Sequence, residues 1–291
     1  MKAIIFGYSG QDGLYLSTIL KRHNIQVIGI SRSKGEIRGD VSDYNFVVTT
    51  IKQYLPDYIF HFAANSTTRH SALFENHGAI CTGTLNILES VRLHCETAKV
   101  FLSGSAMQFK NTGLPIDETT EFDARSPYSV ARIHSTYAGR YYRKTFGLKV
   151  YCGYFFNHDS PLRSEAHVNQ KIVKAVHRIA QGKENSLELG NLDVKKEFNF
   201  AGDIVEAVWQ LVNQDIIFEA VIGSGKAYSI LDWSVYCFKK MGLDWEKFVI
   251  QKQGFVPEYS ILVSNPARIT SIGWKPQTDF WNLADMMMDI K

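Results

Sequence analysis

The sequence contains few cysteines, no long hydrophobic run and no block of like charges, and each shortage excludes a class of protein. The four cysteines are scattered, with no CxxC pair and no His/Cys spacing of a metal site, which predicts reduced thiols in a cytoplasmic protein and no bound metal. No apolar stretch approaches the roughly 18 residues of a membrane helix, and the chain opens on a strand-like segment. We therefore expect neither a membrane contact nor a signal peptide. A net charge of +3 without a basic cluster predicts no nucleic-acid partner.

The N-terminal segment, residues 2–13 (KAIIFGYSGQDG), joins a short apolar run to the glycines Gly7, Gly10 and Gly13. A helical pattern follows from Leu14, so the segment reads as strand, tight turn and helix. In such a unit Gly7 permits the turn, Gly10 lets the backbone approach a pyrophosphate, and Gly13 lets the helix pack closely. Free amides and the positive end of the helix dipole then face the phosphates. The pattern predicts a dinucleotide site; the alternative is an ordinary turn between strand and helix.

The second strand, expected at residues 26–30, ends in the basic turn Ser31-Arg32-Ser33-Lys34. Dinucleotide-binding folds select their cofactor at this position, where an acidic residue favours the ribose of NAD. A guanidinium between hydroxyls instead favours a 2′-phosphate, so we predict NADP, with NAD as the alternative. The alternative is a solvated basic turn without a ligand, which would have the same residues. Asp40 follows a short third strand and is expected to bond the adenine or to cap a helix that begins near Ser42.

Strands expected near residues 58–62 and 100–103 alternate with helical segments, one of which spans residues 73–94. This alternation predicts the α/β class, a Rossmann-like doubly wound parallel sheet whose ligand lies outside the carboxyl ends of the strands. Ala63 and Ala64 follow the strand at 58–62. Their small side chains would let a dinucleotide lie across the strand ends, or they serve close packing only.

Ser105 lies at the end of the strand near residue 103, and Tyr128 begins an amphipathic helix expected at residues 129–146. Arg132 follows Tyr128 by four residues and so lies on the same helix face one turn later. A hydroxyl, a phenol and a cation in this arrangement can transfer a proton beside a nicotinamide, with the serine on the substrate oxygen. A capped helix with an incidental surface arginine is the alternative.

Beyond these local patterns, the chain resembles the extended short-chain dehydrogenase/reductases, and within them the GDP-mannose 4,6-dehydratases. Matching stretches include GYSGQDGLYL (7–16), FHFAANS (60–66), FFNHDSP (155–161) and LELGNLDVKKEF (187–198), and the match runs essentially from end to end. The resemblance implies NADP, a nucleotide-sugar substrate, with a GDP-sugar favoured, and a homodimer or tetramer built on the helices near 73–97 and 129–146.

The resemblance also implies site residues, position by position. Ser105 takes the place of the catalytic Ser/Thr, Tyr128 that of the YxxxK tyrosine, and Arg132 that of its lysine. The implied cofactor residues are Gly7, Ser9, Gly10, Gln11, Asp12, Gly13, Arg32, Asp40, Val41, Ala63, Ala64, Tyr128 and Arg132. The implied substrate residues are Asn157, Lys171, Leu189, Gly190 and Lys196.

Departures from the family pattern bear on the chemistry. The dehydratases carry an acid two residues after the catalytic Ser/Thr, where this chain has Met107, or Ala106 if the alignment contains no gap. Neither side chain can carry a proton, and the loss of a general base typically costs about 10²–10⁴-fold in rate. Arg132 is bulkier than the lysine that it replaces. Val256 stands where the dehydratases have an arginine on the nucleotide, and Ile80 replaces a polar helix residue.

Residues 1–155 are expected to form the NADP-binding domain, with 201–228 returning to it, and residues 156–200 and 229–291 a smaller mixed α/β substrate-binding region. We predict hydride transfer at C4 of a nucleotide-linked sugar in polysaccharide synthesis, by a reductase or epimerase rather than a full dehydratase. A dehydratase with a displaced base is the nearest alternative. An NADP-binding pseudoenzyme or regulatory module is an alternative of another class.

Overall fold

The large sheet of the computed structural model, which describes residues 1–289, consists of seven parallel strands. Their order is β11-β6-β5-β4-β1-β2-β3. The strands span Lys2–Phe6 (β1), Gln26–Ser31 (β2), Ile37–Arg38 (β3), Tyr58–His61 (β4), Lys99–Ser105 (β5), Val150–Phe155 (β6) and Glu219–Ile222 (β11). The order runs outward in both directions from β1, so the predicted Rossmann-like doubly wound sheet is confirmed.

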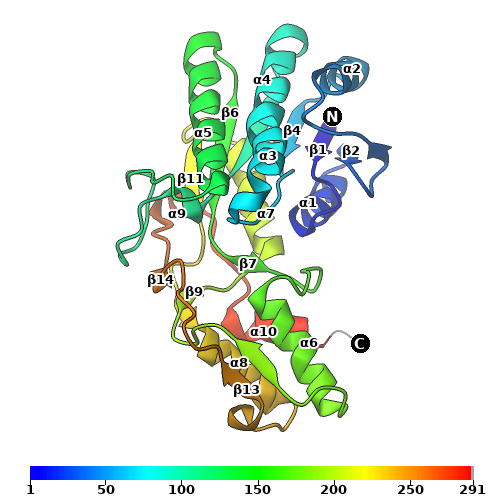
Figure 1. Ribbon diagram of the computed structural model, residues 1–291. Coiled ribbons are helices and arrows are strands. Elements are labelled where there is room, and N and C mark those ends of the chain that lie inside the picture. Colours follow the sequence, from blue (N-terminus) through cyan, green and yellow to red (C-terminus); the bar gives the residue numbers. More distant parts are fainter. Residues whose placement is uncertain (290–291) are drawn as a thin grey trace.

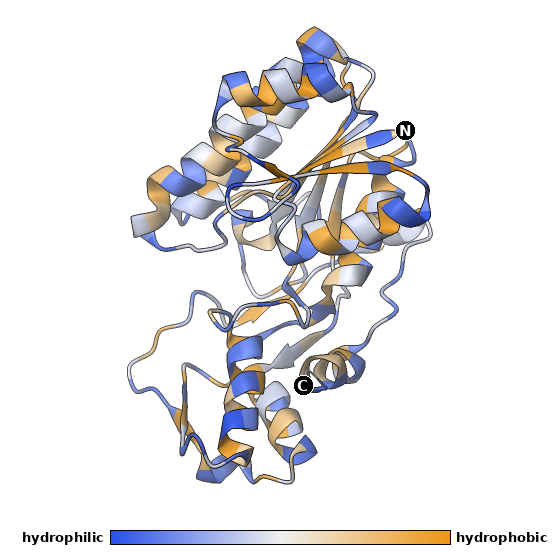
Figure 2. Ribbon diagram, turned by 90° about the vertical axis from the view of Figure 1, so that its right-hand side faces the viewer, coloured by the Kyte–Doolittle hydropathy of each residue, from blue (hydrophilic) through white to orange (hydrophobic). Residues whose placement is uncertain are grey.

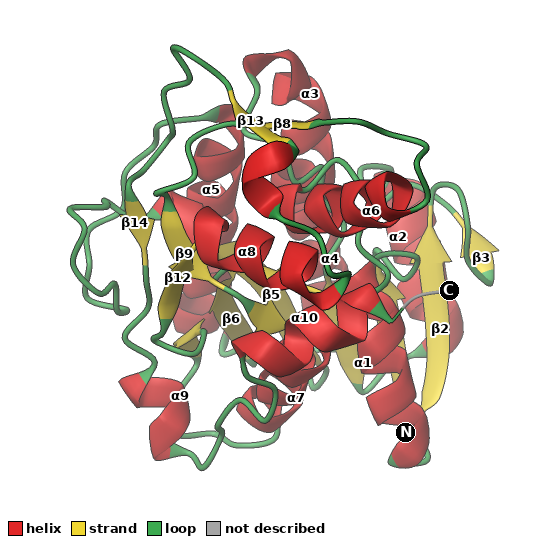
Figure 3. Ribbon diagram, turned by 90° about the horizontal axis from the view of Figure 1, so that it is seen from below, coloured by secondary structure: helices red, strands yellow, loops and turns green. Residues whose placement is uncertain are grey.

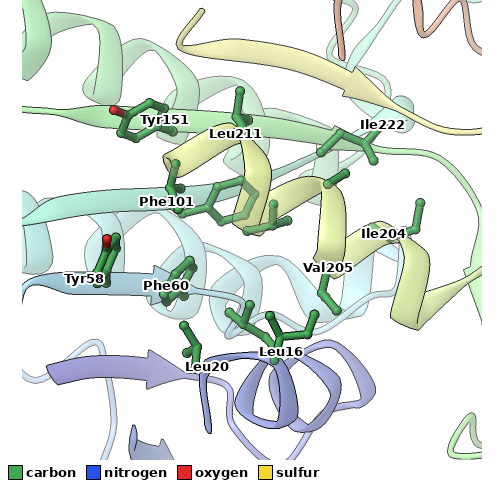
Figure 4. Packing of buried hydrophobic residues seen from close by; sticks show 14 of the residues in the cluster. Leu16, Leu20, Tyr58, Phe60, Phe101, Tyr151, Ile204, Val205, Leu211 and Ile222 are labelled. Atoms are coloured by element: carbon green, nitrogen blue, oxygen red, sulfur yellow. The ribbon is translucent and has the colours of Figure 1, made fainter. Parts of the chain in front are cut away.

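Both faces of the sheet are covered, and the strands are accordingly apolar on both sides. Ala3 and Ile5 of β1 pack against α1 (Gln11–Arg22) and α7 (Ala201–Val212), whose buried side chains meet over β4, β5 and β6 (Figure 4). The alternate residues Ile4 and Phe6 pack on the other face. The helices there are α2 (Tyr44–Tyr54), α4 (Gly83–His94) and α5 (Pro127–Phe146). Figure 2 shows the central strands as hydrophobic along most of their length.

The predicted helix at residues 73–94 is interrupted by a π-helical turn. The chain forms α3 (Leu73–Asn76), the π turn His77–Thr82 and then α4. Such turns are often found at functional sites, and this one packs Ile80 and Cys81 against Tyr128. No pattern in the sequence indicates the extra residue in this turn.

Helix α5 begins where its local sequence dictates. The Ser126 hydroxyl accepts a hydrogen bond from the Ser129 amide (3.1 Å), and the Ser129 hydroxyl accepts one from the Ser126 amide (2.8 Å). Pro127 occupies the first turn, where no amide hydrogen is needed. The helix ends at Gly147, which adopts φ +71°. This start places Tyr128 in the first turn, next to the carboxyl end of β5.

The remaining elements form a smaller unit below the large sheet (Figures 1 and 3). Its helices are α6 (Val168–Ala180), α8 (Ile230–Lys240) and α10 (Phe280–Met288), and α9 (Ala267–Ser271) packs beside β11. Three small sheets pair β7 (His158–Asp159) with β10 (Asn199–Phe200), β8 (Leu187–Leu189) with β13 (Val249–Gln251), and β9 (Lys195–Glu197) with β12 (Ala227–Ser229) and β14 (Ile261–Leu262). Single-turn 3₁₀ helices span His70–Ala72, Ala106–Gln108 and Trp245–Lys247. Within residues 1–289, no helix has the length and apolarity to span a membrane.

Candidate active site

The glycine turn after β1 leaves space for a ligand at the start of α1. Gly7 has φ +89°, and a Cβ atom on it would lie 2.6 Å from the backbone nitrogen of Ala63. A Cβ on Gly13 would lie 2.7 Å from the Gly7 carbonyl oxygen, so both glycines are required by backbone packing. Gly10 caps α1 without a side chain, which leaves the first amides of the helix free of a protein cap. These amides can bind the phosphates of a dinucleotide.

A cavity of about 270 Å³, called here the Arg32 cavity, opens beside this turn. It is lined by the predicted cofactor residues Gly7, Ser9, Gly10, Arg32, Asp40, Val41, Ala63 and Ala64. The Arg32 guanidinium bonds the Glu75 carboxylate (2.8 Å), and this bond lowers the pKa of Glu75. Asp40 does not cap a helix, because α2 begins at Tyr44 with Asp43 as its cap. Its carboxylate instead accepts bonds from the amide and the hydroxyl of Ser42.

A second cavity of about 300 Å³, the Tyr128 cavity, joins the first, since both are lined by Gly10, Phe62 and Ala64. It contains the predicted residues Gln11, Asp12, Ser105, Tyr128, Arg132 and Asn157. A continuous cleft therefore crosses the carboxyl ends of β1, β4, β5 and β6, where a doubly wound sheet binds its ligand. The bare Gly10 and the free first amides of α1 fit a dinucleotide.

Arg132 lies beneath this cleft and is only 5% exposed. One of its terminal nitrogens donates to the Ser103 carbonyl and to the Ser103 hydroxyl, the latter at 2.8 Å. That hydroxyl in turn donates to the carbonyl of His61 (2.9 Å). The guanidinium carbon lies 5.1 Å from the centre of the Tyr128 ring. The structure thus brings the predicted phenol and cation together and fixes the cation on β5.

Among the residues described as lining the Tyr128 cavity, no carboxylate stands beside Ser105 in place of the missing acid; Glu258 lines the adjoining cavity that Met107 also lines, and there it accepts a hydrogen bond from the Thr68 hydroxyl. Met107 lines the cleft, and the buried Gln108 is engaged with the Ser105 amide (2.9 Å) and the Thr136 hydroxyl (3.1 Å). Glu118 accepts a bond from the Val221 amide (2.6 Å), outside the cleft. Among the residues described as lining the Tyr128 cavity, Asp12 is the one acid.

Asp12 is paired with His158, which was not among the predicted site residues. The His158 Nε2 lies 3.0 Å from an Asp12 oxygen, and its Nδ1 lies 2.8 Å from the Phe156 carbonyl. Burial disfavours both charges, but their attraction outweighs it, so the pKa of Asp12 is lowered and that of His158 is raised. The Ser160 hydroxyl also donates to Gln11 (2.8 Å). The start of α1 is thereby connected to the substrate side of the cleft.

The predicted substrate residues do not all lie together. Asn157 lines the Tyr128 cavity, and its buried Oδ1 has no partner among the described residues. Gly190 and Lys196 line a further cavity of about 440 Å³, which shares Thr68 with the Tyr128 cavity. Lys171 bonds the Glu188 carbonyl (2.6 Å), and Leu189 is part of the hydrophobic core of the smaller unit; neither lines the cavities described here. His158 and His167 line the cleft and were not among the predicted site residues, and Arg163 lines it as well.

Solved structures share this architecture. A UDP-glucose 4-epimerase from Thermus thermophilus, in complex with NAD, superposes with a TM-score of 0.86 at 17% identity over 99% of this chain and 98% of its own. A protein named RMD from Pseudomonas aeruginosa, in complex with NADPH, superposes with a TM-score of 0.87 at 20% identity over 99% and 97%. These likenesses define the fold class of the chain, a Rossmann-like doubly wound sheet.

Comparison with known sequences identifies the family to which the chain belongs within this fold class. The profile of the GDP-mannose 4,6 dehydratase family matches residues 4–287. GDP-mannose 4,6 dehydratase 2 of Arabidopsis thaliana is 31% identical over 99% of this chain and 86% of its own length. A GDP-mannose 4,6-dehydratase of Vibrio cholerae is 30% identical over 88% and 76%. The chain belongs to the GDP-mannose 4,6 dehydratase family, as its sequence had indicated.

Proposed function

We propose that this protein transfers a hydride between NADP(H) and C4 of a nucleotide-linked sugar, as a ketoreductase or a 4-epimerase. The observation that carries the proposal is Met107 in the cleft beside Ser105, with no free acid among the described lining residues. Full 4,6-dehydration must remove the C5 proton, which requires a base at carbon. Hydride transfer at C4 requires only a proton donor and acceptor at oxygen.

The residues of the cleft have distinct roles in this reaction. When bound, NADP(H) supplies or accepts the hydride. The Ser105 hydroxyl holds the sugar oxygen, and Tyr128 donates its phenolic proton to that oxygen on reduction and accepts it on oxidation. Arg132, held on Ser103, keeps a positive charge beside the phenol. The first amides of α1 hold the pyrophosphate.

Arg32 favours NADP over NAD. Its guanidinium lines the Arg32 cavity and is 56% exposed, and its present partner Glu75 sits at the surface. A 2′-phosphate is a stronger partner for a guanidinium than an exposed carboxylate, because more oxygens and more charge face it. The NADPH in the Pseudomonas aeruginosa structure supports the same choice.

The substrate is proposed to be a GDP-sugar, following the names of the relatives. Asn157 and Lys196 are proposed to hold its diphosphate and nucleotide. A homodimer, or a tetramer formed from two such dimers, is proposed through α4 and α5. Both helices expose large apolar side chains, among them Leu85, Leu93, Tyr137 and Tyr141. Light scattering of the purified protein would give the mass of the assembly.

A three-way assay tests the reaction. Purified protein is given NADPH with GDP-4-keto-6-deoxymannose, and separately NADP with GDP-mannose in deuterated water. A ketoreductase consumes NADPH in proportion to product, and a 4-epimerase interconverts C4 epimers without net cofactor change. The Tyr128→Phe variant, which keeps the ring and removes the proton, is the matched control. A 4-keto-6-deoxy product with deuterium at C5 would instead show that another base replaces the missing acid.

A further inference from the structure

His167 lies where the segment before α6 faces the reaction site. It lines the Tyr128 cavity and also an adjoining cavity of about 740 Å³, called here the outer cavity. Met107 and Asn157 line both cavities as well, together with the hydroxyl-bearing Ser66 and Thr68. A group bound between His167 and Met107 therefore lies in the cavity that Ser105 also lines.

A chain of polar contacts fixes the protonation of the imidazole. Asp159 is buried and accepts a bond from Asn169 (2.5 Å), and its other oxygen lies 3.3 Å from Nε of Arg163. A terminal nitrogen of Arg163 lies 3.2 Å from Nδ1 of His167. Since a guanidinium can only donate, Nδ1 accepts, and the ring hydrogen must be on Nε2.

The electrostatics of the segment keep this imidazole neutral. Burial, and then the positive charge of Arg163, lower the pKa of His167 to about 4; Asp159 acts in the opposite sense, and Lys196 and His158 add to the lowering. At neutral pH the ring therefore presents an N–H donor at Nε2, and the structure gives this atom no protein partner among residues 1–289. The lone pair on Nδ1 is engaged, so His167 is no substitute for the missing carbon base.

We propose that His167 is a specificity-determining residue that donates a hydrogen bond from Nε2 to an oxygen of the sugar. The inference rests on the proposed function, because it needs a nucleotide-linked sugar in the Tyr128 cavity. A neutral donor suits a hydroxyl or carbonyl oxygen. The doubly charged diphosphate is better matched by the cations Arg163 and Lys196, which lie nearby.

Calorimetric binding of GDP-mannose and of GDP to the protein saturated with NADP tests the inference. His167→Phe keeps a ring of similar size and removes the donor, and His167→Gln retains an N–H near the position of Nε2. The loss of one neutral hydrogen bond corresponds to roughly a 2- to 10-fold change in affinity. We expect His167→Phe to weaken the binding of GDP-mannose by this factor and to leave the binding of GDP unchanged. We expect His167→Gln to restore most of the lost affinity for GDP-mannose.

The other outcomes separate the two proposals. An equal loss for GDP-mannose and GDP would place the contact on the diphosphate, and no loss in His167→Phe would remove the contact altogether; either overturns the role of His167 alone. If the wild-type protein binds GDP-mannose no more tightly than GDP, the sugar makes no contact that His167 could supply. This result would also contradict the proposed substrate. Wild-type binding of GDP-mannose above GDP, without turnover of any substrate, would contradict the reaction but leave the His167 test valid.

Discussion

Replacing Gly10 by alanine should separate cofactor binding from folding. Gly10 has φ −76°, which any residue adopts, and a Cβ atom on it would meet only the Gly7 carbonyl oxygen, at 3.4 Å. The loss of a glycine from the unfolded chain and the poorer helix cap have opposite effects of similar size. We therefore expect the apo variant to unfold within about 1 kcal/mol of the wild type.

Cofactor binding should respond quite differently. The methyl group would stand at the wall shared by the Arg32 and Tyr128 cavities, where the pyrophosphate must approach the first amides of α1. A ligand at about 100 times its Kd stabilises a protein by about 2.7 kcal/mol. If the methyl weakens binding about 100-fold, the same concentration gives only about 0.4 kcal/mol.

Unfolding midpoints with and without NADP measure both quantities in one experiment. Gly7→Ala is the contrasting control, because φ +89° and a Cβ contact of 2.6 Å with Ala63 predict a loss of at least about 2 kcal/mol without any cofactor. A Gly10→Ala protein that NADP stabilises as much as the wild type would refute the placement of the pyrophosphate. So would a Gly10→Ala protein that fails to fold.

Three further changes test other parts of the argument. Met107→Glu should confer exchange of the C5 proton of GDP-mannose with deuterated water, by about 10²-fold over wild type, since it restores a base at that position; unchanged exchange would contradict its placement. Arg32→Ala should weaken the binding of NADP by about 10-fold or more, because a charged hydrogen bond is lost, and should leave the binding of NAD unchanged. A fluorescence titration with each cofactor measures both affinities. Burial opposes the charge of Glu219, but hydrogen bonds, first of all from Arg140, lower its pKa from 4.5 to about 2. Its carboxylate therefore stabilises the fold above about pH 4.5 and ceases to do so as the pH falls through 2, so Glu219→Gln should cost about 3 kcal/mol in urea unfolding at pH 7 and much less near pH 2.

The parts of the site that the sequence predicted are those set by local geometry. The turn at Gly7 follows from a strand that must reverse into a helix, and Pro127 with Ser126 fixes the start of α5 and hence Tyr128. The fold was predictable for the same reason, because the strands are apolar on both faces and alternate with amphipathic helices. Each of these features depends on residues close together in the chain.

Contacts between distant segments were not predictable in this way. The hydrogen bond from Arg132 to Ser103 joins α5 to β5, and the Asp12–His158 pair joins α1 to the segment after β6. The role of His167 depends on its contact with Arg163, which is four residues earlier in the chain. The buried Asp159 in turn pairs with Arg163. Only the contact across the fold distinguishes such residues from ordinary surface histidines.

Taken together, these contacts give the cleft one chemical character. Ser105, Tyr128, Arg132 and His167 all present hydrogen-bond donors, and the acid that lines the Tyr128 cavity, Asp12, is neutralised by its histidine. Donors stabilise negative charge that develops on an oxygen, as it does when a hydride is added to a ketone. Removal of a proton from carbon needs an acceptor instead; the position that carries the acid in the family holds the thioether of Met107, and the Nδ1 lone pair of His167 is already used. The thioether at Met107 and the proposed donor at His167 therefore point the same way, toward chemistry confined to C4 and its oxygen.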